Sequence, residues 1–316
     1  MHLGSEAWFL TGPTAVGKTA VALALAERIG AEIVSMDSMA IYRGMDIGTA
    51  KPTPGERQRV PHHLLDRIEP HEDFSLAQYI DAAQAVAAEI RERGRQVLFA
   101  GGTPLYLKGL LRGIFQGPPA DWEFRRAVMA EAASHEPGWL RTRLRAVDPA
   151  AAERLHANDT RRLIRALEVF ERTGHPISEL QQQFERGAPA EACRVFVLDR
   201  SRDELHARID RRVDAMFAEG LVEEVRRILA KPQAMSKTAR QAVGYGEVID
   251  YLEGRHDLAT TVELVKTHTR QLAKRQSTWF RSLSECRFVE IQGDVPAEEI
   301  AERIVAGTLR VPSALK

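Results

Sequence analysis

The sequence lacks the features that mark secreted, membrane-spanning and zinc-stabilised proteins. Its two cysteines, Cys193 and Cys286, lie far apart and outside any CxxC or Cys/His spacing, which argues against a disulfide framework and a structural zinc site. No apolar run is as long as a membrane span, and residues 1–10 lack the long apolar core of a signal peptide. We therefore expect a cytoplasmic protein without membrane contact.

An excess of charge of either sign is also missing, because 44 basic residues balance 44 acidic residues. A uniformly basic surface is therefore excluded, and any nucleic-acid site must be a local basic patch. Aromatic residues make up only 6% of the chain, but 44% hydrophobic and 28% charged residues are ordinary for a globular protein. The length of 316 residues suits one large domain, or a core with a smaller companion.

Short apolar runs alternate with helical patterns over most of the chain. The candidate strands are residues 7–11, 32–35, 96–100, 194–198 and 288–291. The candidate helices are residues 19–29, 76–93, 203–229 and 260–283. This alternation predicts an α/β fold in which helices flank a parallel sheet.

One stretch interrupts the alternation. Residues 118–189 are rich in Ala and Arg, contain no convincing strand, and are bounded by Gly-Pro-Pro and Gly-Ala-Pro sequences. We interpret this stretch as a small helical domain inserted into the core. The core domain is then discontinuous, with residues 1–117 and 190–316 on either side of the insertion.

A phosphate-binding loop stands between the first strand and the first helix. Its sequence, GPTAVGKT, fits the pattern G-x-x-x-x-G-K-[ST] at every position, from Gly12 to Thr19. In such a loop, backbone amides and a helix N-terminus point at one anion. Lys18 adds a positive charge, and the Thr19 hydroxyl is suited to bind Mg²⁺. The predicted phosphate-binding residues are Gly12, Pro13, Thr14, Ala15, Val16, Gly17, Lys18 and Thr19.

The loop indicates phosphate binding rather than ATP hydrolysis. The strand at 96–100 runs into Gly101-Gly102-Thr103, so no acid follows it to hold a metal or polarise water. Asp37 directly follows the second strand, at the sheet edge where open α/β folds bind ligands. We interpret Asp37 as a general base or metal ligand. His62 and His63 have no nucleophile beside them in the sequence, which favours a structural role.

Several blocks in order along the chain resemble one family, the tRNA dimethylallyltransferases, also called isopentenyltransferases. The blocks are residues 12–19 (GPTAVGKT), 37–42 (DSMAIY), 45–52 (MDIGTAKP), 62–66 (HHLLD), 101–106 (GGTPLY), 158–168 (NDTRRLIRALE), 243–245 (VGY) and 269–276 (TRQLAKRQ). The blocks at 45–52 and 269–276 are far more diagnostic than a phosphate loop. The resemblance covers nearly the whole chain.

The resemblance implies a reaction and roles for particular residues. The phosphate loop would hold the diphosphate of dimethylallyl diphosphate together with Mg²⁺. Asp37 would accept a proton from the N6 amine of an adenosine 3′-adjacent to the tRNA anticodon, and Thr103 would lie beside the reacting centre. Arg212 would clamp the diphosphate; Arg208, one turn earlier on the same helical face, is the alternative.

The resemblance also implies contacts with the tRNA anticodon stem-loop. The residues concerned are Asp37, Ser38, Met39, Ala40, Thr103, Arg125, Arg161, Arg162, Leu163, Ile164, Arg165, Gln241, Ala242, Val243, Gly244, Tyr245 and Gly246. To these we add Lys266, Arg270 and Lys274, which recur every fourth residue on one face of the last long helix. The heptad-spaced Val265, Leu272 and Trp279 should form the core face of that helix. No obligate protein partner is expected, and a monomer is the default.

Two other functions share some of these features. A small-molecule or nucleotide kinase would have the same loop and would use Asp37 on an acceptor hydroxyl. A nucleotide-switched RNA-binding protein would have the loop and the basic clusters without catalysis. The transferase predicts a salt-sensitive complex with tRNA and activity that is independent of ATP, whereas the kinase predicts neither.

Overall fold

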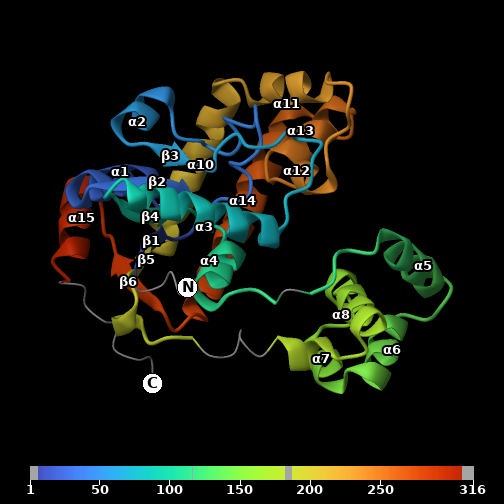
Figure 1. The fold of residues 1–316 in the computed structure, drawn as a ribbon. Coiled ribbons are helices and arrows are strands. Elements are labelled where there is room, and N and C mark those ends of the chain that lie inside the picture. The colour runs from blue at the N-terminus through green and yellow to red at the C-terminus, as the bar shows by residue number, and fades with distance from the viewer. Residues whose placement is uncertain (1–5, 116, 182–186, 308–316) are drawn as a thin grey trace. The chain divides into compact units, whose positions relative to one another are not determined.

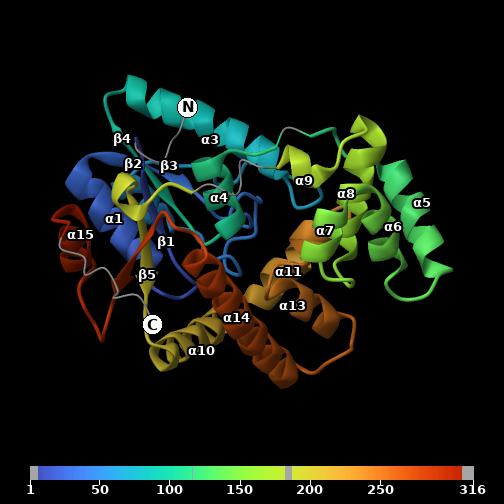
Figure 2. The same cartoon turned by 90° about the horizontal axis from the view of Figure 1, so that it is seen from below.

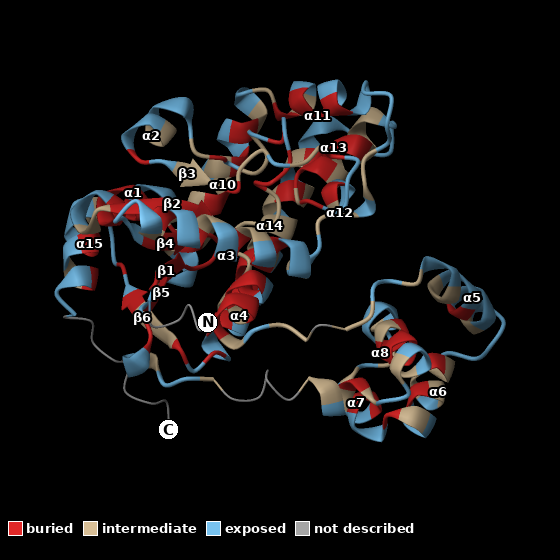
Figure 3. Ribbon diagram, viewed as in Figure 1, coloured by how far each residue is buried: buried red, intermediate tan, exposed pale blue. Residues whose placement is uncertain are grey.

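The computed structural model describes residues 6–115, 117–181 and 187–307. These residues form two compact units, a core unit (Met1–Leu111 and Gly187–Lys316) and a helical unit (Arg112–Arg186). Each unit has its own buried interior, visible in red in Figure 3. No helix among the described residues is both long and apolar enough to cross a membrane.

The core unit is built on one parallel sheet (Figure 1). Its strands are β1 (Trp8–Thr11), β2 (Ala31–Ser35), β3 (His62–His63), β4 (Gln96–Ala100), β5 (Val195–Asp199) and β6 (Cys286–Glu290). They are arranged in the order β3-β2-β4-β1-β5-β6, and every neighbouring pair is parallel. The predicted α/β fold is therefore confirmed.

The short edge strand β3 was not predicted from the sequence. It pairs with β2, and His63 Nε2 lies 2.7 Å from the Glu32 carboxylate, while His62 Nδ1 lies 2.8 Å from the Val60 carbonyl oxygen. The two histidines thus have the structural role expected of them. A two-residue strand is too short to leave a periodic pattern in the sequence.

Helices cover both faces of the sheet. Those of the core unit are α1 (Lys18–Ile29), α2 (Pro54–Arg59), α3 (Leu76–Glu92), α4 (Pro104–Arg112), α10 (Arg202–Ala218), α11 (Leu221–Leu229), α12 (Lys237–Arg240), α13 (Tyr245–Leu252), α14 (Leu258–Arg281) and α15 (Ala297–Val305). Figure 2 shows the strands between α3 on one side and α1 with α15 on the other. Because the strands are parallel, all their carboxyl ends meet at one edge, where the loops after β1, β2 and β4 lie.

Two helix predictions need correction. Residues 203–229 form two helices rather than one, because Gly220 adopts φ 100°, a left-handed conformation that ends α10 and starts α11. The heptad core face of α14 is also wrong: Val265 is buried, but Trp279 is 39% exposed. A straight helix drifts about 20° for each heptad, so the buried face passes to Ala273 and Phe280.

The helical unit contains α5 (Trp122–Ala133), α6 (Trp139–Val147), α7 (Pro149–Arg154), α8 (Thr160–Thr173) and α9 (Ile177–Leu180). Its apolar interior joins Val128 of α5, Leu144 of α6, and Leu163 and Leu167 of α8. Aspartates cap the amino ends of α5, α7 and α8, and each side chain accepts a hydrogen bond from the backbone amide three residues further along the chain.

Candidate active site

The phosphate loop joins β1, an inner strand of the sheet, to α1. Gly12 has φ 144°, and a Cβ atom there would lie 2.6 Å from the Leu198 carbonyl oxygen, so the turn requires glycine. Gly17 is also left-handed, with φ 109°, and stands at the N-cap of α1. The loop therefore directs the first amides of α1 toward one point, which is the geometry that binds an anion.

Lys18 is the first residue of α1, and its side chain turns back along the loop. Its Nζ donates to the carbonyl oxygens of Gly12 at 3.0 Å and Pro13 at 2.8 Å. Burial of the ammonium group, with the nearby Arg212 acting in the same direction and Asp37 opposing it, lowers the pKa of Lys18 to about 8. A phosphate group placed here would stabilise the charged form of the lysine.

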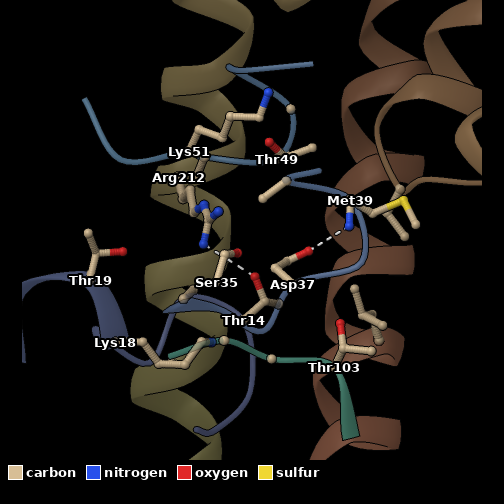
Figure 4. A pocket seen from close by; sticks show the side chains of 18 of the residues that line it. Thr14, Lys18, Thr19, Ser35, Asp37, Met39, Thr49, Lys51, Thr103 and Arg212 are labelled. Atoms are coloured by element: carbon tan, nitrogen blue, oxygen red, sulfur yellow. Dashed lines mark hydrogen bonds between the residues drawn. The ribbon is translucent and has the colours of Figure 1, made fainter. Parts of the chain in front are cut away.

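Three arginines from the segment after β5 hold the outer edge of the loop. Arg200 Nε donates to the Val16 carbonyl oxygen at 3.2 Å, and Arg208 Nε donates to that of Ala15 at 2.9 Å. Arg212 Nη1 donates to the Thr14 hydroxyl at 3.2 Å, as Figure 4 shows. Burial lowers the pKa of Arg212, although Asp37 opposes the shift.

Asp37 lies beyond the end of β2 and faces the same space as Arg212 (Figure 4). Its Oδ1 accepts a hydrogen bond from the Met39 amide at 2.8 Å, which fixes the carboxylate at the start of a turn. The Ser38 amide donates to the Thr103 hydroxyl at 3.0 Å. Thr103 thus ties the loop after β2 to the loop after β4.

These groups line one pocket of about 800 Å³ in the core unit. The predicted site residues that it gathers are Thr14, Ala15, Gly17, Lys18, Thr19, Asp37, Ser38, Met39, Ala40, Thr103, Arg212, Gln241, Ala242 and Val243, with the alternative Arg208. Arg211, Arg275 and Gln276 also line it and were not among the predicted site residues. Arg275 and Gln276 belong to the block at 269–276, which was the available signal for them.

The charge of the pocket is strongly positive. Six lysines and arginines line it: Lys51 is paired with Asp46 and Asp66, whereas Lys18, Arg208, Arg211, Arg212 and Arg275 form no ion pair among the described residues. Asp37 and Glu56 are the carboxylates of the lining. Such an excess of unpaired cations suits a polyanion, and a diphosphate or a nucleic-acid backbone has that charge.

Within the predicted tRNA-contacting segment 241–246, Tyr245 packs against the loop of residues 46–48 instead of lining the pocket. The Tyr245 hydroxyl donates to Glu224 at 2.6 Å, and a Cβ at Gly48 would lie 2.4 Å from the Tyr245 ring. Glu224 is 2% exposed and also accepts the amides of Asp46, Ile47 and Gly48 at 3.0, 2.8 and 3.2 Å. Buried Tyr245 therefore anchors the lining loop rather than facing the pocket.

Lys266, Arg270 and Lys274 of α14 were predicted to contact tRNA, but two of them are engaged in ion pairs within the protein. Lys266 forms an ion pair with Asp214 at 2.8 Å, and Arg270 forms one with Asp210 at 2.5 Å, both on α10. These two cations hold the two helices together, so the structure does not present them as free phosphate ligands. Lys274 is exposed.

In the helical unit, two predicted tRNA ligands share one buried acid. Glu168 is fully buried and accepts hydrogen bonds from Arg125 Nε and Nη2, both at 2.8 Å, and from Arg165. Burial opposes these bonds, but together they keep the pKa of Glu168 below its ordinary value. Arg125 and Arg165 therefore have fixed orientations.

The rest of the predicted cluster in the helical unit divides into two groups. Arg161 and Arg162 are exposed, and Arg162 lies 2.7 Å from Asp159. Leu163 and Ile164 are buried in the unit's core, so their side chains cannot contact RNA in this conformation, which corrects that part of the prediction. On a helix, each residue is rotated by about 100° from the one before it, so Arg161 and Arg162 can face solvent while Leu163 and Ile164 face the core.

A parallel sheet with a phosphate loop after an inner strand, and a carboxylate across a cationic pocket, defines a phosphate-loop group-transfer enzyme. The family model described as IPP transferase matches residues 40–283. The chain belongs to the tRNA dimethylallyltransferase family. It is 50% identical over 286 residues to the tRNA dimethylallyltransferase of Rhodopirellula baltica, covering 88% of this chain and 86% of that protein.

Further relatives agree. The tRNA dimethylallyltransferase of Pelotomaculum thermopropionicum is 44% identical, with 95% of each chain covered. The crystal structure of the full-length tRNA isopentenylpyrophosphate transferase of Bacillus halodurans superimposes with a TM-score of 0.68 at 36% identity over 96% of each chain. A eukaryotic dimethylallyltransferase acting on tRNA, at 24% identity, has a TM-score of 0.75 over 97% of this chain and 81% of its own, and supports the fold.

Proposed function

We propose that the protein transfers the dimethylallyl group of dimethylallyl diphosphate to N6 of the adenosine 3′-adjacent to a tRNA anticodon. One observation carries the proposal: a single pocket brings the phosphate loop and Arg212 to face Asp37. The names of the relatives, tRNA dimethylallyltransferase and tRNA isopentenylpyrophosphate transferase, support both the prenyl group and the tRNA as substrates. The remaining residues of the pocket are consistent with this chemistry.

The donor side of the reaction requires stabilisation of a leaving anion. The bond between the dimethylallyl C1 and the diphosphate oxygen breaks, and its electron pair leaves on the diphosphate. Lys18, the loop amides and Arg212 lie around the pocket and would stabilise that charge; such electrostatic stabilisation is usually the largest single contribution to catalysis. Arg208, whose Nε is bound to the Ala15 carbonyl oxygen, stabilises the loop itself.

Mg²⁺ fits this donor side. The Thr19 hydroxyl lines the pocket one residue after Lys18, and hydroxyl, carboxylate and phosphate oxygens are the ligands that Mg²⁺ prefers. Thr19 would hold the ion, which would neutralise part of the charge of the leaving diphosphate.

The acceptor side requires a proton acceptor. The adenine N6 amine is a weak nucleophile because its lone pair is delocalised into the ring. As the bond from N6 to C1 forms, N6 must lose one proton, and the Asp37 carboxylate is the base that faces the pocket. Thr103 holds the backbone beside Asp37 through the Ser38 amide.

The tRNA must present an unstacked base, which costs a few kcal/mol and is offset by contacts in the pocket and to the backbone. Residues 38–40 and 241–243 line the pocket and are proposed to contact the anticodon loop. Exposed Arg161, Arg162 and Lys274 are proposed to contact its phosphates, with Arg125 and Arg165 oriented by Glu168. No protein partner is needed for this scheme.

The test is label transfer by the full chain. Purified protein, Mg²⁺, labelled dimethylallyl diphosphate and unmodified tRNA are mixed, with ATP added in a parallel tube. Label is expected in the tRNA, at the adenosine beside the anticodon, to the same extent with and without ATP. Absence of label, together with release of the γ-phosphate of ATP, would instead identify a kinase or a nucleotide-dependent switch.

A further inference from the structure

One buried amide joins the two halves of the pocket. Gln276 of α14 is 9% exposed, and its side chain crosses between two loops that are far apart in the sequence. Its Oε1 accepts a hydrogen bond from the Thr14 amide of the phosphate loop at 2.9 Å. Its Nε2 donates to the Gly102 carbonyl oxygen, in the loop after β4, at 2.6 Å.

The fit around this amide is tight. A Cβ atom on Gly102 would lie 2.8 Å from Gln276 Nε2 and 3.4 Å from Lys18 Nζ. The loop after β4 therefore passes in contact with both the amide and the phosphate-loop lysine. Any side chain at Gly102 would push the Gln276 amide aside, whereas its first carbon would be in ordinary van der Waals contact with Lys18 Nζ.

The bridge continues to Thr103 and Asp37, the residues proposed to act on the acceptor adenine (the acceptor groups). Thr103 follows Gly102 directly, and its hydroxyl accepts the Ser38 amide at 3.0 Å. Asp37 precedes Ser38, so a continuous path of hydrogen bonds and peptide links runs from Thr14 through Gln276 to the carboxylate. The distance between the phosphate loop and the Asp37 carboxylate is set along this path.

We propose that Gln276 is a positioning residue that fixes the spacing between the phosphate loop and the acceptor groups, a role that rests on the function proposed above. It touches neither reacting atom in this role. It also occupies the Thr14 amide, which is thereby withdrawn from the amides that bind the diphosphate. The side chain must offer an acceptor to one loop and a donor to the other, which a primary amide does at every pH and a carboxyl does only when it is protonated.

A small error in this spacing has a large cost in rate. Transfer between two bound substrates depends on near-attack geometry, and a displacement of about 1 Å far from the chemistry can reduce the rate about 10²-fold. The side chains that bind the diphosphate and the tRNA are themselves unchanged when Gln276 is replaced. Loss of Gln276 is therefore expected to lower kcat more than it raises either KM.

The first test compares Gln276→Met and Gln276→Glu with the matched control Gln271→Glu, an exposed position on the same helix. Steady-state transfer of dimethylallyl to tRNA is measured below the melting temperature of each variant. Both Gln276 variants are expected to lose about 10²-fold in kcat with KM values within a few-fold of the wild type. Gln271→Glu is expected to match the wild type.

The pH profile of Gln276→Glu separates positioning from a merely structural role. A glutamate here faces the Gly102 carbonyl oxygen without a proton to donate, and burial raises its pKa. As the pH falls from 8 to 6, the protonated carboxyl can donate again, so the activity of Gln276→Glu relative to the wild type should rise. Gln276→Met should show no such recovery.

Gly102→Ala provides an independent variant if substitution of Gln276 prevents folding, because it displaces the amide from the loop side. It should show the same loss in kcat. Wild-type kcat in Gln276→Met, Gln276→Glu and Gly102→Ala, or a loss confined to KM for dimethylallyl diphosphate, overturns the positioning role. If the wild type itself transfers no label, it is the proposed function that fails.

Discussion

Asp37 is expected to affect chemistry rather than binding because of the charges around it. Burial lowers the pKa of both Lys18 and Arg212, and the Asp37 carboxylate opposes that shift by favouring their charged forms. Its own negative charge repels a diphosphate, so Asp37 is not expected to add to diphosphate affinity. Asp37→Ala should lower kcat by about 10²–10⁴-fold, the usual contribution of a general base. Affinity for pyrophosphate and tRNA should be retained.

The control for Asp37→Ala is Asp81→Ala, an exposed position on α3. Single-turnover transfer gives the chemical step, and filter binding gives the affinity for tRNA. A variant with normal kcat and weakened tRNA binding would make Asp37 a binding residue.

Lys18 gives a pH prediction whose sign follows from its low pKa. With a pKa of about 8, the lysine of the free protein loses its proton as the pH rises through that value. Bound pyrophosphate favours the charged form, so binding takes up a proton and weakens above pH 8. Affinity at pH 9 should be about tenfold lower than at pH 7.

Calorimetry with inorganic pyrophosphate and Mg²⁺, in buffers of different ionisation enthalpy, measures both the affinity and the proton uptake. Because pyrophosphate also titrates, Lys18→Arg serves as the reference with a permanently charged side chain. Parallel pH profiles for the two proteins would show that Lys18 does not titrate in this range.

The residues of the site differ in how far the sequence could reveal them. Lys18 belongs to a local motif and Asp37 to the end of a strand, so both were predictable. The block at 269–276 could point to Gln276, but not to its bridging role, because its partners Thr14 and Gly102 lie 262 and 174 positions away and meet it through packing of α14. No local pattern encodes a bridge of that length.

At the level of elements, the loop of residues 46–52 is held in shape by a helix far away in the sequence. Glu224 on α11 accepts three of its backbone amides and the Tyr245 hydroxyl. Glu224→Ala leaves three part-buried amides and the buried Tyr245 hydroxyl without this partner and should destabilise the protein by about 3 kcal/mol. Tyr245→Phe, which loses one hydrogen bond, should cost about 1 kcal/mol.

Urea unfolding of the full chain measures these losses. Glu223→Ala is the matched control, because Glu223 is the adjacent residue, is exposed, and pairs with Arg226 on the surface. Its effect should stay within about 0.5 kcal/mol. Equal losses for Glu223→Ala and Glu224→Ala would contradict the anchoring role.

The elements themselves were predicted as far as periodicity extends. Five of the six strands and the long helices follow from apolar patterns, but the break at Gly220 was missed because α10 and α11 share a continuous helical pattern. The role of the basic face of α14 was misassigned for another reason. Asp210 and Asp214 are four residues apart on α10 and match Lys266 and Arg270, a complementarity that is meaningful only once the helices pack.

For the whole molecule, the proposed function requires that both units bind one tRNA. Each phosphate contact releases condensed counterions, so it adds about one to the slope of log K against log salt. Lys274→Ala in the core unit and Arg161→Ala in the helical unit should each weaken tRNA binding and reduce that slope by about one. Both side chains are exposed and have no ion pair among the described residues.

Lys266→Ala is the control for Lys274→Ala: it shows whether the lower salt slope comes from a lost contact with RNA or merely from removing a positive charge from α14. It removes the same charge from the same helix as Lys274→Ala, but Lys266 is bound to Asp214, so it should leave the salt slope unchanged. If both units contact the same tRNA molecule, the double variant of Lys274 and Arg161 should lose about two from the slope. A slope reduced by Lys274→Ala but not by Arg161→Ala would mean that the helical unit binds no RNA phosphate through Arg161, and that the core unit supplies the electrostatic contacts.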